Sequence, residues 1–267
     1  RDSLKIELHT NVPASPIRSE LFSTERLEQH AKSLAEAQRV GPAPLRIVSL
    51  PRKLKRNARQ LVEDYRALAK TANAAKPITS AGEWFLANFY IVEEQAREVV
   101  KDLPPRYYRE LPKLLDGPLA GYPRVYGIAW AIVAHSDSAL DVDRLTRFID
   151  AYQSLAPLMI GELWAIAITL RLVLVENLSR LTHNVVARVA DGDRADAVAN
   201  EITTALLREE PDANVLSRLK DEAITPAFLA RFEQRLRDQG ASTDSVLREI
   251  ERQLELHNTA ANTVIQA

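Results

Sequence analysis

The sequence has no cysteine, only five histidines and almost no net charge. The absence of cysteine excludes disulfides, thiolate metal sites and cysteine nucleophiles, and it suits a reducing compartment. The 35 lysine and arginine residues offset the 36 aspartate and glutamate residues, so no large field of one sign exists to attract nucleic acid. We therefore expect no nucleic-acid partner. A chain of 267 residues can bury one large core or two smaller ones.

Targeting and membrane signals are weak. Arg1 to His9 lack an apolar signal-peptide core, and the start at an arginine leads us to expect a piece of a longer protein. Leu158 to Leu178 is mostly apolar and about 20 residues long, the length that crosses a bilayer. It contains Glu162, Arg171 and Glu176, and an arginine near the midplane costs roughly 2.5–3.5 kcal/mol. We expect a buried central helix rather than a membrane span.

Strand patterns are scarce as well. Only Leu4, Ile6 and Leu8 alternate clearly, and one short apolar run covers residues 45–50; extended chain would explain both. Without several strands there is no sheet for a Rossmann-type or sugar-nucleotide transferase domain. Apolar residues three and four apart recur almost end to end. The predicted fold class is therefore all-α, a multi-helix bundle of amphipathic helices with a helical-hairpin C-terminal extension.

We expect three parts along the chain. Residues 1–50 form an extended segment and a first helix capped by Ser23. Residues 51–183 form a compact helical core, and residues 184–267 form charged helical hairpins. The helices expected after the first two cover residues 80–103, 125–134, 141–156, 160–181, 193–208, 214–223, 225–239 and 243–257.

The sequence also predicts how the third helix begins and which face of the second helix is buried. Thr79 or Ser80 opens the third helix, since Ser80 and Glu83 have the capping-box spacing. The long helix that begins with Pro51 has an apolar stripe. Its opposite face, with Lys53, Arg56, Arg59 and Glu63, is expected to be solvated.

Several triplets resemble catalytic or metal-binding motifs. Asp141–Asp143 and Asp191–Asp193 have the Asp-x-Asp form that holds a metal in many sugar-nucleotide transferases, but that role needs a strand end. We interpret the first as a helix cap and the second as an interhelical turn. His135, Ser136 and Asp137 contain the types of a nucleophilic triad, yet adjacent residues rarely form one. We therefore expect His135 to cap a helix C-terminus.

Glutamates on helices are the other catalytic candidates. Glu93, Glu94 and Glu98 could suggest the paired carboxylates of glycoside hydrolysis. Arg97 and Lys101 lie alongside them, so a solvated charged face is the preferred interpretation.

Glu162 precedes an apolar helix, where desolvation could raise its pKa. Capping of the first helical turn explains it more simply. No metal-ligand spacing and no glycine-rich phosphate loop appears. We predict no catalytic residue and no metal ligand in this chain.

A loop rich in glycine, proline and tyrosine is the best candidate binding surface. In GPLAGYPRVYG, residues 117–127, Tyr122, Arg124 and Tyr126 could stack on and hydrogen-bond to a sugar or a protein. A rigid loop that buries its tyrosines in the core is the alternative. The candidate substrate-binding residues are Tyr107, Tyr108, Tyr122, Arg124, Tyr126, Glu162 and Trp164.

Four long motifs stand out: ELFSTERLEQHAKSLA at 20–35, AGEWFLANFYIVEEQAREV at 81–99, LPPRYYRELPKLLDGPLAGYPRVYGIAW at 103–130 and GELWAIAITLRLVLVENLSRL at 161–181. They closely resemble the N-terminal region of bacterial cyclic β-1,2-glucan synthases. The resemblance is looser beyond residue 181. None of the four motifs is a catalytic signature of that family, and no family catalytic residue can be carried over.

The resemblance implies a very large inner-membrane parent. This parent joins the N-terminal region to a membrane-embedded glycosyltransferase that uses UDP-glucose and a divalent metal, and to glycoside hydrolase- and phosphorylase-like domains. This module would hold no cofactor of its own. It would lie on the cytoplasmic side of the inner membrane, with residues 184–267 leading toward its partners, the transferase and membrane domains of the same chain.

Three functions stay open at this point. The first is a non-catalytic scaffold or regulatory region of such a synthase. The second is a carbohydrate-binding module that binds nascent glucan through Tyr107, Tyr108, Tyr122, Trp130 and Trp164. The third is an autonomous glycosidase, which would use Glu94 or Glu162 with a second carboxylate roughly 5–9.5 Å away.

Overall fold

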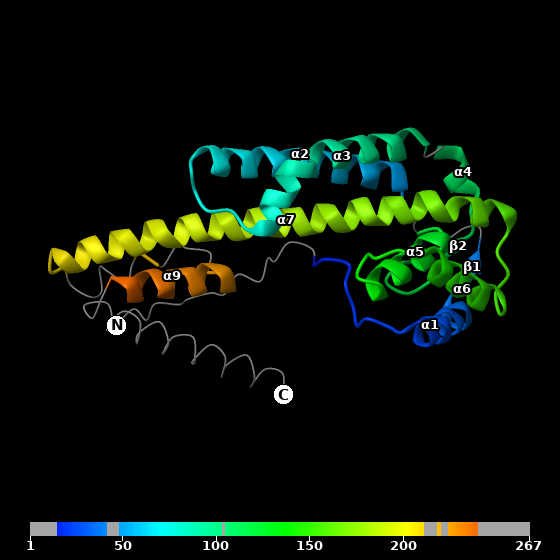
Figure 1. The fold of residues 1–267 in the computed structure, drawn as a ribbon. Helices are drawn as coiled ribbons and strands as arrows, with labels where there is room; N and C mark the ends of the chain where they lie inside the picture. The colour runs from blue at the N-terminus through cyan, green and yellow to red at the C-terminus, as the bar shows by residue number, and fades with distance from the viewer. Residues whose placement is uncertain (1–14, 42–47, 103–104, 211–217, 220–223, 240–267) are drawn as a thin grey trace, which may run out of the picture. The chain divides into compact units, whose positions relative to one another are not determined.

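The part of the chain that the structure describes is essentially all-α, with one two-stranded sheet (Figure 1), which confirms the predicted fold class. The structure is a computed structural model that describes residues 15–41, 48–102, 105–210, 218–219 and 224–239. One compact unit covers Pro13–Val185 and a second contains the rest of the chain. The predicted helix at 243–257, nearly all of that at 214–223, and the apolar alternation of Leu4, Ile6 and Leu8 lie outside the described residues.

Helix α1 (Thr24–Ala37) begins where the sequence indicates. The Ser23 hydroxyl accepts a hydrogen bond from the Arg26 N–H and so caps the first turn. Leu27, Ala31 and Ala35 form its buried face, which packs on α6 (Val142–Gln153) and on α5 (Arg124–His135). The Asp141 carboxylate accepts a hydrogen bond from the Asp143 N–H at 3.1 Å, so the cap predicted at the first Asp-x-Asp triplet is confirmed.

Helices α2 (Leu50–Asn73) and α3 (Ser80–Asp102) pack against each other. The rings of Tyr65 and Phe89 stack between them with centroids 4.1 Å apart. Of the two residues predicted to open α3, Thr79 does so. Its hydroxyl accepts a hydrogen bond from the Gly82 N–H at 3.2 Å, which makes Thr79 the cap and places Glu83 one position beyond the capping-box site.

A short sheet that the sequence did not predict fixes the tyrosine-rich loop. Strands β1 (Val40–Gly41) and β2 (Lys113–Leu114) pair in antiparallel fashion, with Val40 opposite Leu114. Between β2 and α5, Gly117 and Gly121 adopt φ values of 74° and 85°, a conformation that glycine adopts without steric cost. The loop therefore folds back on itself and delivers the chain to the start of α5.

Helix α7 (Ile160–Leu207) is far longer than expected. The predicted end at Leu181 and the predicted turn at the second Asp-x-Asp triplet, residues 191–193, are both wrong, because the helix continues through them. No proline occurs between Pro157 and Pro211, and one internal glycine costs only about 1 kcal/mol. Across the described part of the chain, no helix has both the length and the hydropathy to cross a membrane.

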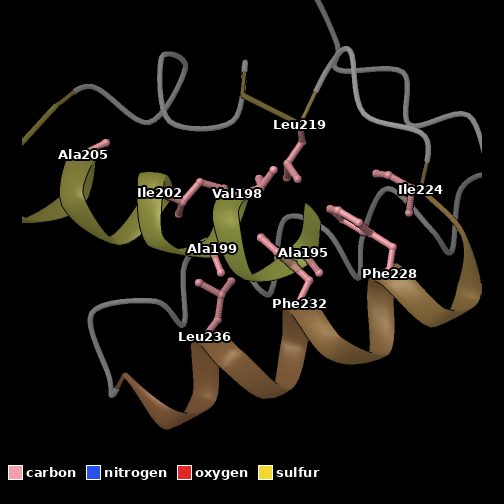
Figure 2. Close-up of a cluster of buried hydrophobic side chains, with 10 residues drawn as sticks. All are labelled: Ala195, Val198, Ala199, Ile202, Ala205, Leu219, Ile224, Phe228, Phe232 and Leu236. Carbon is pink, nitrogen blue, oxygen red and sulfur yellow. The ribbon is translucent and has the colours of Figure 1, made fainter. Parts of the chain in front are cut away.

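The second unit has its own small apolar core, shown in Figure 2. Helix α9 (Pro226–Asp238) starts as predicted, since the Thr225 hydroxyl accepts a hydrogen bond from the Phe228 N–H at 3.1 Å and a proline follows. Arg231 holds Asp196 through two hydrogen bonds of 2.8 Å. The buried side chains are Ala195, Val198, Ala199, Ile202, Ala205, Leu219, Ile224, Phe228, Phe232 and Leu236.

Candidate functional site

A pocket lined by polar and charged residues lies between α2 and the part of α7 that belongs to the first unit. Positions three, four and seven apart share one face of a helix, and each helix contributes four side chains with that spacing. The cavity measures about 230 Å³. Its lining residues are Lys53, Arg56, Asn57 and Gln60 from α2, and Glu176, Ser179, Arg180 and His183 from α7.

Two contacts fix the direction of the helices along this pocket. The Lys53 Nζ lies 2.9 Å from the Glu176 Oε1, and the Gln60 Nε2 lies 3.1 Å from the His183 Nδ1. Both partners advance by seven residues from the first contact to the second. The two helices therefore run parallel here.

Glu176 is the buried acidic centre of the pocket, with a side chain 2% exposed. It accepts hydrogen bonds from Arg180 at 2.6 Å and from the Tyr126 hydroxyl at 2.6 Å, besides its ion pair with Lys53. Burial, followed by the negative charge of Glu176, raises the pKa of Tyr126 above its ordinary value. The phenol therefore stays protonated and donates its hydrogen to the carboxylate.

Aromatic rings extend this network. The Lys53 ammonium donates to the hydroxyls of Tyr122 and Tyr126 at 2.8 and 2.9 Å. The two tyrosine rings stack with centroids 4.4 Å apart, and the Arg180 guanidinium lies 4.9 Å from the centre of the Trp130 ring. The sequence predicted that Lys53 lies on a solvated face of α2. This prediction is wrong for Lys53, because its side chain is only 11% exposed.

A second buried carboxylate, Asp64, lies beside the pocket residues Gln60 and His183. It accepts hydrogen bonds from Gln60 and from the Thr182 hydroxyl, each at 2.9 Å. The His183 Nδ1 lies 3.3 Å from Asp64 as well. Buried acids require such partners, and Gln60 from α2 and Thr182 from α7 provide them here.

Arg124 and Glu162 form a separate buried centre beneath the start of α7. The Arg124 Nε donates to the Glu162 Oε1 at 2.8 Å, and its Nη2 pairs with the other carboxylate oxygen. Glu162 also accepts a hydrogen bond from the Met159 N–H at 3.1 Å, so it caps the first turn, which was the preferred interpretation. Burial alone would lower the pKa of Arg124, but its hydrogen bond to Glu162 and the charge of Glu162 raise it above the ordinary value.

Lys113 satisfies the end of α4 (Pro105–Glu110). Its ammonium donates to the carbonyls of Tyr108 and Arg109 at 2.8 and 3.1 Å and also to that of Leu111. Burial lowers the pKa of Lys113, and the charge of Glu162 opposes this shift. A larger cavity of about 340 Å³ borders Lys113 and the first turn of α2, but carbonyl oxygens already engage this ammonium.

The candidate substrate-binding residues fall into three groups. Arg124, Glu162, Tyr108 and Tyr126 are buried, and burial raises the pKa of Tyr108 to about 12. Tyr107 and Tyr122 are half-buried; the Tyr107 hydroxyl donates to the Gly161 carbonyl, and Tyr122 stacks in the network around Lys53. Trp164 is 78% exposed. The structure thus brings Tyr122 and Tyr126 together and pairs Arg124 with Glu162.

Two residues of the triplet His135, Ser136 and Asp137 have structural partners. His135 contacts the Glu20 carbonyl at 2.7 Å and stacks on Phe22, whereas Asp137 lies 3.4 Å from Arg18. His135 and Asp137 therefore point to different partners, and the buried Ser136 hydroxyl has no hydrogen-bond partner among the described residues.

The glutamates of α3 lie on an exposed face. Glu93, Glu94 and Glu98 are exposed, and Glu93 pairs with Arg97 at 3.3 Å. This is the solvated charged face that was expected. Within the ranges that the structure describes, no three histidine or acidic side chains come together as a metal site.

Sequence reasoning missed the pocket residues. Lys53, Glu176, Arg180 and His183 were not candidates, and Asp64 was not noticed. The available signal was the matching spacing of polar residues on α2 and α7, together with an acid beside an otherwise apolar stripe.

Comparison with known proteins agrees with the motifs in the sequence. No protein-family model matches the chain. The chain is 33% identical over 255 residues to the cyclic beta-(1,2)-glucan synthase NdvB of Rhizobium meliloti (strain 1021). The alignment covers 94% of this chain and only 9% of that protein, so the chain spans less than a tenth of the length of its relative. The chain is a homologue of one segment of a cyclic β-(1,2)-glucan synthase, and the resemblance is confirmed.

Proposed function

We propose that the chain is a non-catalytic helical scaffold region of a cyclic β-(1,2)-glucan synthase whose parent transfers glucose from UDP-glucose. The observation that supports this role is the state of the buried acids. Glu162 is paired with Arg124, Glu176 with Lys53 and Arg180, and Asp64 with the hydrogen-bond donors Gln60 and Thr182. Carboxylates held in this way stabilise helix contacts and are poorly placed to act as a general acid and base.

The test separates a structural role from a catalytic one within a complete synthase. Glu162→Gln and Glu176→Gln each remove a charge while keeping the shape of the side chain. For a scaffold, synthesis of cyclic glucan from UDP-glucose should fall only as far as the melting temperature and the amount of folded protein fall. Loss of synthesis in a variant with unchanged stability and expression would contradict the proposal.

The implied sidedness is tested independently. As the family resemblance implies, this region lies on the cytoplasmic face of the membrane and contacts the transferase and membrane domains of the parent. A protease site introduced into the exposed α3 face, at Glu94, should be cut in inverted membrane vesicles and protected in intact spheroplasts. The opposite pattern would place the region on the other side.

A second candidate function, glucan binding, is favoured by one surface feature. Trp164 is 78% exposed and lies beside the exposed side chains of Met159, Ile160 and Leu163. An exposed tryptophan offers a flat apolar face on which a sugar ring can stack. Titration with linear β-1,2-glucan should then change the tryptophan fluorescence of the chain. Trp164→Ala should abolish the change and Trp84→Ala, at another exposed tryptophan, should not; an equal response in both variants would refute the role.

A further inference from the structure

The pocket between α2 and α7 contains more hydrogen-bond donors than its own acceptors use. Lys53 and Arg180 are engaged with Glu176. Arg56 is exposed, and no interaction of its guanidinium is found among the described residues. The Nδ2 atom of Asn57 is buried and has no hydrogen-bond partner. A buried amide donor without a partner is costly, so a bound species that accepts hydrogen bonds would stabilise this site.

The charged residues that line the pocket indicate the charge of a ligand that would bind there. Three cations, Lys53, Arg56 and Arg180, line the cavity with one carboxylate, Glu176. The second nearby acid, Asp64, is not part of the lining and already accepts hydrogen bonds from Gln60 and Thr182. The lining therefore has an excess of positive charge beside unused N–H donors, which favours an anion.

The arrangement of the donors indicates which kind of anion the pocket would bind. The donors that remain come from two helices, since they belong to the guanidinium groups of Arg56 from α2 and Arg180 from α7 and to the amide of Asn57, so they approach from several directions. A tetrahedral phosphate group presents several acceptor oxygens to such a set. The cavity of about 230 Å³ exceeds the roughly 30 Å³ that one water molecule occupies in the liquid, so it has room for a phosphate and part of a substituent.

We infer that this pocket binds a phosphate group, either as free inorganic phosphate or as the phosphate of a small ester. Arg56 and Asn57 provide the donors that the protein leaves unused. Lys53 and Arg180 supply positive charge while they continue to hold Glu176. The site is separate from the Arg124–Glu162 centre, and the inference does not depend on the scaffold role.

The experiment measures thermal unfolding and calorimetric binding of the purified chain with inorganic phosphate and with glycerol 3-phosphate. Potassium chloride at matched ionic strength serves as a control, because screening alone changes stability. We expect both phosphates to raise the melting temperature above the chloride control. Tighter binding of glycerol 3-phosphate would identify esters as the ligand, and tighter binding of inorganic phosphate would identify the free ion. No response beyond that of chloride would overturn the inference.

Two variants and one control test the assignment of residues. Arg56→Ala removes a cation that forms no ion pair with the described residues, and it should weaken phosphate binding roughly tenfold to a hundredfold, the effect of losing a charge-assisted hydrogen bond. Asn57→Ala should weaken it several-fold. Lys55→Ala removes another exposed cation of α2 that does not line the pocket and should leave affinity unchanged. Equal losses in the Arg56 and Lys55 variants would show non-specific attraction and overturn the site, and circular dichroism verifies that each variant is folded.

Discussion

Arg124 and Glu162 lie 38 residues apart and meet through two parallel contacts that tie the start of α5 to the first turn of α7. Neither side chain is more than 8% exposed. Because the same carboxylate caps α7, one acid connects the tyrosine-rich loop, helix α5 and the longest helix of the chain. The relationship explains why an arginine occupies an otherwise apolar helix.

Replacing only one residue of this pair should destabilise the fold far more than replacing both. Arg124→Met leaves Glu162 buried without a counter-charge and should lower the free energy of unfolding by about 3–5 kcal/mol. The double variant Arg124→Met with Glu162→Leu should recover much of that loss, as measured by urea denaturation. Arg97→Met, in the exposed pair with Glu93, should cost less than about 1 kcal/mol. A double variant as unstable as the sum of both singles would contradict the expectation.

Lys113 is expected to be a structural cation. Replacing it by methionine preserves most of the apolar stem but leaves three carbonyls, two buried and one part-buried, without their donor. We expect a loss of about 3 kcal/mol in the free energy of unfolding, since each lost bond costs about 1 kcal/mol. Guanidinium denaturation measures this loss, with Lys55→Met as the exposed control. A loss no larger than in that control would show that water replaces the ammonium.

His30 should make the stability of the first unit depend on pH. Burial, and secondly the charge of His135, lowers its pKa below the ordinary value of 6.5. The unfolded chain therefore binds a proton more readily than the folded chain, so the free energy of unfolding rises with pH in this range. Stability should decline as the pH falls below about 6.5 and level off below the folded pKa.

The check for this effect is a set of urea transitions at several pH values. His30→Gln should flatten the dependence between neutral pH and about pH 5, although the variant itself can be less stable at every pH. An unchanged slope in His30→Gln would mean that other groups cause the dependence.

Two glycines in helices should respond in opposite ways to alanine. At Gly127 a Cβ would lie 2.7 Å from the Gln38 Nε2 and 3.1 Å from the Leu114 Cδ1, and displacing Gln38 would disturb its 2.7 Å hydrogen bond from Tyr152. Gly127→Ala should therefore destabilise the chain by about 1–2 kcal/mol. At Gly192 the nearest atom lies 3.9 Å away, so Gly192→Ala should stabilise by about 0.5–1 kcal/mol. Melting temperatures of the two variants that move in the same direction would contradict this contrast.

The sequence predicted helix starts better than helix ends. Ser23, Asp141 and Thr225 cap helices as expected, because a cap depends on one side chain and its own backbone. The end of α7 was missed, since no local signal forces a helix to stop or to continue past Gly192. Asp191, expected in a turn, instead accepts a hydrogen bond from the Thr225 hydroxyl at 2.6 Å, a contact between residues far apart in sequence. The division into three parts at residues 50 and 183 stays a prediction.

The candidate site was harder to predict than the fold. Glu162 was assigned correctly as a cap, but its partner Arg124 was expected on a binding surface, because periodicity alone does not show which distant helix a charged residue will face. The pocket residues Lys53 and Glu176 belong to helices that were both predicted. Their pairing depends on how the two helices align in space, and nothing local in the sequence fixes that alignment. Glucan binding by the tyrosines and by Trp164 also stays a prediction.

The parallel course of α2 and α7 restricts which changes of chain length the protein can accept. Lys53 contacts Glu176 and Gln60 contacts His183, so the two helices are joined by two contacts that lie seven residues apart on each helix. One extra residue between Lys53 and Gln60 would rotate everything beyond it by about 100°, turning Gln60 and Asp64 away from α7 while Lys53 stayed in place. The fold can tolerate single substitutions between α2 and α7, because each changes only one contact. An insertion or deletion in one of these helices would need a matching one in the other to keep both contacts.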